Sequence, residues 1–146
     1  MRVFLVAVLI ALTLRCTRQG PDLIVPSPDG TRTASVHNHW SIDPPSQTLW
    51  LDETRVATLG EDMDWCNTVV WSRDGSTVAY LVQDAELIVV DADIGRRTSS
   101  QWLVEQDGYP TTREVRNLTI DGTIARYRSC VRGSRSCSEV LEASIR

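Results

Sequence analysis

Three of the four Asp-Gly dipeptides recur at nearly equal spacing, and they constrain the fold more than any other feature of the sequence. They stand at Asp29-Gly30, Asp74-Gly75 and Asp121-Gly122, which are 45 and 47 residues apart. An Asp-Gly pair between apolar segments is the strongest short-range signal of a β-hairpin. The regular spacing therefore predicts three copies of one strand-rich unit.

The residues around each Asp-Gly pair predict a strand, a hairpin, a second strand, a loop and a third strand. In the middle copy the strands Thr68–Trp71, Thr77–Val82 and Glu86–Asp91 are rich in β-branched and aromatic residues, and Gln101–Val104 is the expected fourth. The other copies are expected to hold the strands Leu23–Val25, Thr33–His37, Thr48–Leu51 and Arg55–Leu59, then Glu114–Ile120, Thr123–Cys130 and Ser138–Ile145. No window shows sustained helical periodicity. We therefore expect an all-β fold, an antiparallel meander of about three propeller-blade-like repeats.

Alternation within the expected strands predicts which side chains form the core. The expected core residues are Val36, Leu49, Leu51, Val56, Leu59, Val70, Val78, Tyr80, Leu87, Val89, Leu118, Ile120, Ile124 and Leu141.

The turn sequences resemble the repeat of TolB-type, WD-like β-propellers. Ser27–Ala34 and Ser72–Tyr80 carry the Ser-x-Asp-Gly turn followed by an apolar-Ala pair, and Leu87–Gly95 carries an apolar run ending in Asp-x-x-x-Gly. Arg73 replaces the proline of this repeat in the second copy. The resemblance implies a binding platform, an assembly scaffold or a peptidase gate, since such propellers serve in all three ways.

The chain has material for about three blades, whereas closed propellers have about four to eight. Three arrangements follow: an open, partial propeller, a sandwich-like domain built of the same hairpins, or a ring completed by several chains. We favour a compact, monomeric all-β domain, because an open edge would otherwise invite strand pairing.

The N-terminus has the pattern of a targeting segment. Arg2 precedes an apolar run from Val3 to Leu14, and twelve helical residues at ~1.5 Å each span about 18 Å, short of the ~30 Å hydrocarbon core. Cys16 follows closely, as in the signal of bacterial lipoproteins, although Arg15 and Thr13 depart from that pattern. We expect a signal at residues 1–16, a tether at 17–21 and one domain at 22–146. A lipid on Cys16, a plain cleaved signal and an uncleaved anchor remain open, and each predicts a periplasmic or extracellular protein.

The charge is unevenly distributed along the chain. Residues 20–108 hold five Arg and fifteen acidic residues, whereas residues 109–146 hold seven Arg and four. A solvated acidic surface explains this pattern most simply, and a basic C-terminal face for an acidic partner is the alternative. With a pI of about 5.1, the chain is a poor candidate for binding nucleic acid.

The cysteines fit an exported protein. Cys130 and Cys137 flank a predicted hairpin turn, and their spacing predicts a disulfide across it. Cys66 is then left unpaired, at a position that we expect to be buried and apolar.

The candidate binding residues lie in two places, the segment His37-Asn38-His39-Trp40 and the hairpin that carries Arg128, Arg132 and Arg135. Tryptophan and arginine are common anchors of protein interfaces. The leading hypothesis is a non-enzymatic envelope domain that binds a protein or another envelope component and needs no cofactor. The alternative is a small metal-dependent hydrolase in which His37, His39 and Asp43 hold the metal. A structural subunit of a larger ring is the third hypothesis.

Overall fold

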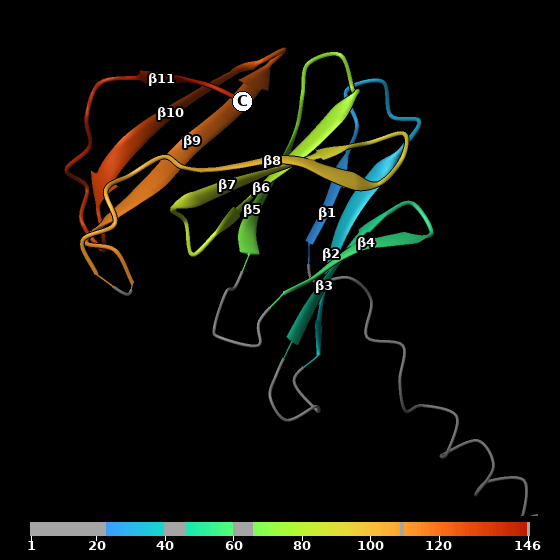
Figure 1. The fold of residues 1–146 in the computed structure, drawn as a ribbon, viewed down its shortest axis with the longest axis horizontal. Coiled ribbons are helices and arrows are strands. Elements are labelled where there is room, and N and C mark those ends of the chain that lie inside the picture. The colour runs from blue at the N-terminus through green and yellow to red at the C-terminus, as the bar shows by residue number, and fades with distance from the viewer. Residues whose placement is uncertain (1–22, 40–45, 60–65, 109, 146) are drawn as a thin grey trace, which may run out of the picture.

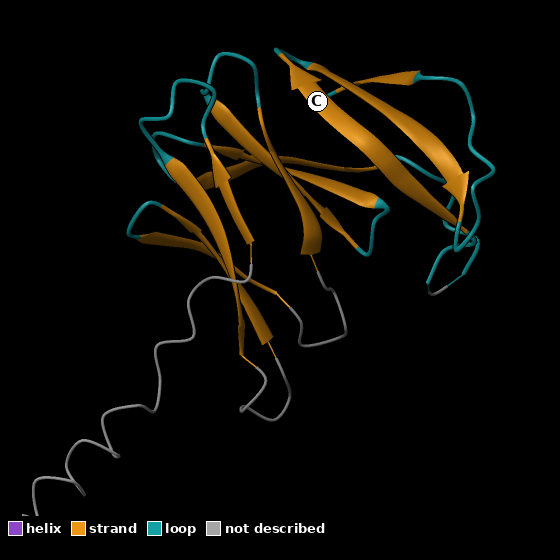
Figure 2. Cartoon of the chain, turned by 180° about the vertical axis from the view of Figure 1, so that it is seen from behind, coloured by secondary structure: helices purple, strands orange, loops and turns teal. Residues whose placement is uncertain are grey.

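The structure is a computed structural model that describes residues 23–39, 46–59, 66–108 and 110–145. These residues form eleven strands and their connecting loops, with no helix among them (Figures 1 and 2). In the same residues there is consequently no helix long and apolar enough to cross a membrane. The strands form three antiparallel sheets, and each sheet is a meander of consecutive strands. The all-β prediction is therefore confirmed.

The three sheets follow one another along the chain, and we call them blades 1, 2 and 3. Blade 1 consists of β1 (Leu23–Pro26), β2 (Thr33–His39), β3 (Ser46–Leu51) and β4 (Thr54–Leu59). Blade 2 consists of β5 (Cys66–Trp71), β6 (Thr77–Val82), β7 (Glu86–Asp91) and β8 (Arg96–Trp102). Blade 3 consists of β9 (Arg113–Asp121), β10 (Ile124–Val131) and β11 (Leu141–Ser144). Blade 2 lies between the other two (Figure 1).

The first two Asp-Gly turns have the same hydrogen bonds, which explains why the sequence repeats there. The Ser27 hydroxyl donates to Asp29 at 2.6 Å, and the Ser72 hydroxyl donates to Asp74 at 2.7 Å. The residue two positions after each aspartate donates its backbone N–H to the same carboxylate at 3.1 Å. Together these hydrogen bonds lower the pKa of both aspartates to about 2, and the bond from the serine hydroxyl contributes most. The glycine after each aspartate has a positive φ, 71° and 73°, which glycine adopts without strain.

Two hydrophobic clusters hold the blades together, one on each face of blade 2. The cluster between blades 1 and 2 contains Ala34, Val36, Leu49, Leu51, Cys66, Val69, Trp71, Val78, Tyr80, Val82, Ile88, Val90 and Ala92. The cluster between blades 2 and 3 contains Ala79, Leu81, Ala85, Leu87, Val89, Leu103, Val104, Val115, Leu118, Ile120, Ala125 and Tyr127. Successive side chains of a strand point to opposite faces, so the residues between Thr77 and Val82 in β6 and between Glu86 and Asp91 in β7 are apolar because both faces of these strands are buried.

Some of the expected core residues are placed differently by the structure. Leu141 is 38% exposed because it lies on β11, at the free edge of blade 3. Val56, Leu59, Val70 and Ile124 are half-buried rather than buried. The expected fourth strand of blade 2 is present as β8, but its expected bounds, 101–104, are wrong: β8 begins at Arg96, and Leu103 and Val104 follow it as buried loop residues. β8 begins this early because the chain reverses in a tight turn directly after β7. The Asp91 carboxylate stabilises that turn by accepting the backbone N–H groups of Asp93 and Ile94.

One arginine connects each pair of neighbouring blades. Between blades 1 and 2, Arg32 forms ion pairs with Asp52 at 3.2 Å and Asp93 at 3.0 Å, and its guanidinium carbon lies 5.8 Å from the centre of the Trp71 ring. Between blades 2 and 3, Arg132 donates to the backbone oxygens of Thr111 and Gln83, both at 2.8 Å. These bonds tie hairpin turns of adjacent blades to each other.

The predicted disulfide is present between Cys130 of β10 and Cys137 in the segment that follows it. The unpaired Cys66 is buried, as expected. Its burial raises the pKa of the thiol to about 12, so Cys66 lacks the thiolate character of a reactive cysteine.

Candidate functional site

The first strands of the three blades, β1, β5 and β9, lie side by side, with β1 against β5 and β5 against β9. Each is the end strand of its sheet, so only one of its edges is paired within the blade. A short parallel bridge joins Ser72 to Ile120, where the Arg73 N–H donates to the Ile120 carbonyl at 3.2 Å. The Trp71 indole N–H donates to the Val25 carbonyl at 2.9 Å. These two contacts fix the three strand edges relative to one another.

A hollow of about 410 Å³ runs over these three strands, and we call it the axial groove. Its lining is mostly apolar and consists of Val25, Pro26, Pro28, Val69, Val70, Trp71, Arg73, Leu118, Thr119 and Ile120. Thr119 and Arg73 are exposed, whereas Val69, Trp71 and Ile120 are buried walls. Val69, Trp71 and Ile120 are also packed in the hydrophobic core, so the packing of the core fixes the shape of the groove.

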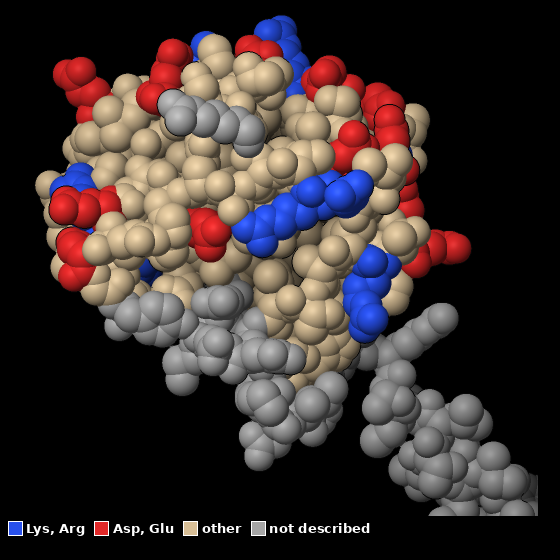
Figure 3. Space-filling view, in the orientation of Figure 1, with Lys and Arg blue, Asp and Glu red and all other residues tan. Residues whose placement is uncertain are grey.

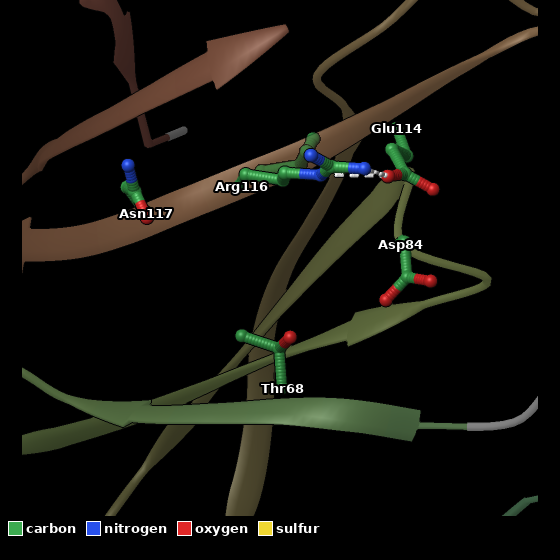
Figure 4. A pocket seen from close by; sticks show the side chains of 6 residues that line it. Thr68, Asp84, Glu114, Arg116 and Asn117 are labelled. Atoms are coloured by element: carbon green, nitrogen blue, oxygen red, sulfur yellow. Dashed lines mark hydrogen bonds and ion pairs between the residues drawn. The ribbon is translucent and has the colours of Figure 1, made fainter. Parts of the chain in front are cut away.

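A second hollow, of about 320 Å³, lies between blades 2 and 3, and we call it the charged pocket. It is lined by Thr68, Asp84, Glu114, Val115, Arg116 and Asn117. Thr68 precedes Val69 on β5, and Asn117 precedes Leu118 on β9, so the pocket continues the axial groove along the same two strands. Figure 4 shows Thr68 and Asp84 on one side of the pocket, and Glu114, Arg116 and Asn117 on the strand opposite.

The two carboxylates of the charged pocket are held differently. Glu114 accepts a hydrogen bond from Arg116 Nε at 2.7 Å, and its other oxygen lies 3.6 Å from Arg132. The Asp84 carboxylate lies 3.8 Å from Arg132, which is an ion pair but too long for a hydrogen bond. Burial raises the pKa of Asp84 above its ordinary value, and the Arg132 charge counteracts this only in part.

Both histidines lie on β2, which extends two residues beyond the expected strand Thr33–His37. As expected for an extended segment, His37 and His39 share one face, the one that points away from blade 2. His37 makes an edge contact with Trp50, with ring centres 6.1 Å apart, and His39 Nε2 lies 2.9 Å from the Thr48 hydroxyl. Trp50 is half-buried and donates its indole N–H to the same hydroxyl at 2.9 Å.

The three arginines of the candidate site belong to blade 3. Arg128 and Arg135 are exposed, whereas Arg132 is half-buried and bonded to the turns of blades 2 and 3. The histidines and these arginines therefore lie at opposite ends of the three-blade arc and form no common site (Figure 1). Trp40, Asp43 and Cys16 lie outside the described residues.

The metal hypothesis has no support in the part of the chain that the structure describes. No group of three or more His, Cys, Asp or Glu side chains there is placed to hold a metal ion. Asp43, the third ligand suggested by the sequence, is not among those residues.

The residues that form the axial groove and the charged pocket were not predicted from the sequence. Asp84 and Glu114 are thirty positions apart, and only the packing of blade 3 on blade 2 brings them together. The one local signal was the Gln83-Asp84 turn, in which both residues have a positive φ, 53° and 56°. Such a turn identifies a hairpin and carries no information about a pocket.

Charge on the molecular surface does not gather into one patch on the face shown in Figure 3. Acidic side chains lie mostly around its margin, basic side chains extend across its middle, and most of the face is neither acidic nor basic.

Similar folds occur among solved structures. The β-propeller domain of Cps50 (Swd1) from Myceliophteria thermophila matches with a TM-score of 0.50 and 13% identity over 88% of this chain and 40% of that one. The structure of U3-55K matches with a TM-score of 0.50 and 15% identity, over 90% and 42%. The RRP9 WD40 repeats match over the same shares with a TM-score of 0.49 and 15% identity, and the fold assignment does not depend on them.

The chain thus spans less than half the length of each of these structures. No protein-family model matches the sequence. The comparison with curated proteins likewise gives no match. The structural similarities show the fold: this chain has three β-propeller-type blades arranged in an open arc.

Proposed function

We propose that this chain is a protein-interaction module that binds an extended peptide segment of its partner in the axial groove. The observation that carries the proposal is a preformed, mostly apolar hollow of about 410 Å³ across three strands that are each paired on one side only. Apolar side chains of a bound segment would be removed from water there, and the free strand edges offer backbone hydrogen bonds.

The compartment that fits this function is the cell envelope. The disulfide between Cys130 and Cys137 supports an oxidising location, and the apolar run after Arg2 supports export by a bacterial signal. We place the partner among envelope proteins, with a lipid on Cys16 as the means of attachment. Fractionation of expressing cells tests this: recovery of the protein in the cytosol with Cys130 and Cys137 reduced would overturn it.

We also propose that the blades are repeats of the TolB type. The Ser-x-Asp-Gly turns with identical hydrogen bonds at Ser27 and Ser72 support a TolB-type repeat. A binding platform is the role of such repeats that agrees with the axial groove.

Binding in the axial groove is tested by selecting peptides from a random phage-displayed library on the purified protein. The test variant is Thr119→Trp, because Thr119 is an exposed lining residue and a larger side chain there fills the groove without emptying the core. Thr58→Trp is the matched control, on an exposed position of β4. We expect selected peptides to bind the control like the wild type and to bind Thr119→Trp at least about tenfold more weakly, a change of ~1.4 kcal/mol. Equal binding to both variants would overturn the proposal.

A further inference from the structure

Asp84 is the least compensated charged group of the charged pocket. Its side chain is 26% exposed and lies in the turn between β6 and β7. No described residue donates a hydrogen bond to its carboxylate, and its ion pair with Arg132 is 3.8 Å long. A partly desolvated carboxylate without hydrogen bonds gains more from a new cationic partner than one that is already paired.

The other charged groups of the pocket are already paired. Arg116 is engaged by Glu114, which accepts its Nε–H at 2.7 Å and a second, shorter bond from the same guanidinium. Arg132 divides its charge between Asp84 and Glu114 and uses its remaining N–H groups on backbone oxygens. An incoming anion would therefore compete with Glu114 for Arg116, whereas an incoming cation meets an Asp84 carboxylate that accepts no hydrogen bond from the described residues.

The pocket also has the polar groups and the position that a basic side chain needs. The Thr68 hydroxyl and the Asn117 amide oxygen are further acceptors in the hollow that Asp84 lines (Figure 4). Because the pocket continues the axial groove along β5 and β9, a segment lying in the groove brings its next side chains to the pocket.

We propose that the charged pocket receives a lysine or arginine side chain of the segment bound in the axial groove, and that Asp84 is its ion-pair partner. This inference rests on the proposed function and adds a sequence preference to it: the partner segment has apolar residues followed or preceded by a basic one. A carboxylate in such a half-buried site forms charge-assisted hydrogen bonds with an ammonium or a guanidinium group.

The substitution Asp84→Asn removes the charge and preserves the turn. Asp84 has φ 56°, and asparagine tolerates this left-handed conformation as well as aspartate does. The backbone carbonyl of residue 84, which accepts the Val115 N–H at 2.6 Å, is also unchanged. Asp121→Asn is the matched control, since it removes one carboxylate from the opposite end of β9.

The experiment selects peptides from the same library on the wild type, on Asp84→Asn and on Asp121→Asn, and sequences them. We expect a Lys or Arg position beside apolar residues in peptides selected on the wild type and on Asp121→Asn, and its loss on Asp84→Asn. For one selected peptide, either Asp84→Asn or replacement of the peptide's basic residue by glutamine should weaken binding about tenfold to hundredfold. The two changes combined should weaken it little further.

The outcomes separate the two proposals. Peptides that bind the groove without a basic position, or that keep that position on Asp84→Asn, would overturn the role of Asp84 and leave the groove intact. Failure to select any peptide that Thr119→Trp excludes would overturn the groove and this inference with it. Replacing the basic residue of the peptide alters no residue of the protein. Binding of that altered peptide to the wild type therefore tests the ion pair with the pocket even if Asp84→Asn folds poorly.

Discussion

Replacement of Leu81 by alanine tests whether blade 2 is buried on both of its faces. Leu81 has no exposed surface and lies on β6, opposite Leu87 in the register with β7 and within the cluster that contacts blade 3. The substitution removes three carbon atoms, which at ~0.8 kcal/mol each costs about 2.4 kcal/mol of transfer free energy. Neighbours come from two sheets that cannot collapse freely, so a residual cavity should raise the cost to about 3–4 kcal/mol.

The assay is urea unfolding followed by tryptophan fluorescence. We expect the midpoint to fall with an unchanged m-value, and the melting temperature to fall by roughly 12–16 °C, at ~4 °C for each kcal/mol. Leu141→Ala is the control, because that leucine is 38% exposed and should cost only about 0.5 kcal/mol. A cost below about 1 kcal/mol for Leu81→Ala, or equal costs for the two variants, would refute the packing of blade 3 on blade 2.

Two further predictions concern the turns and the free thiol. The folded pKa of Asp29 and Asp74, about 2, is below the ordinary value of 3.8, so their stabilising effect is present above pH 3.8 and lost as the pH falls toward 2. The urea midpoint should therefore fall over that range, and a double Asp29→Asn, Asp74→Asn variant should show a smaller fall; equal falls would contradict the assignment. Cys66, with 2% exposure and a thiol pKa of about 12, should resist alkylation at pH 8 in a Cys16→Ser variant until urea unfolds it. Prompt labelling of the native protein would contradict its burial.

Local turn chemistry made the hairpins predictable from the sequence. The strands Thr77–Val82 and Glu86–Asp91 have the predicted bounds, because the turns on either side of them are set by residues a few positions apart. Alternation failed where strands have two buried faces, so Leu81 and Val90 were missed. It also failed for β8, an outer strand whose polar residues are largely exposed and give no apolar pattern.

The candidate site was less predictable, for a physical reason. The groove and the pocket are assembled from strand edges and turns that meet only when neighbouring blades pack. Arg132 illustrates the difference: the sequence identified it as a candidate anchor, and the structure shows it bonded to Thr111 and Gln83 as a connection between blades. A sequence shows which side chains are capable of binding, and packing decides which of them are already engaged.

A second copy of the chain could complete a ring only if the outer faces of blades 1 and 3 pack against each other. In blade 1 the face that points away from blade 2 carries Ser35, Trp50 and Arg55 in one cross-strand row. The corresponding face of blade 3 carries Arg126 and Arg128 of β10.

Closing a six-blade ring from two chains would place these two faces against each other. That contact would bring Arg55 toward the arginines of β10 and would bury polar side chains where blades 1 and 2 bury apolar ones. We therefore expect a monomer near 16.3 kDa, or lower by the mass of a cleaved signal, in light scattering after size exclusion, with and without reductant. A dimer that resists reductant would show that the end faces do pair, and the axial groove would then be the inside of a closed channel rather than an open surface.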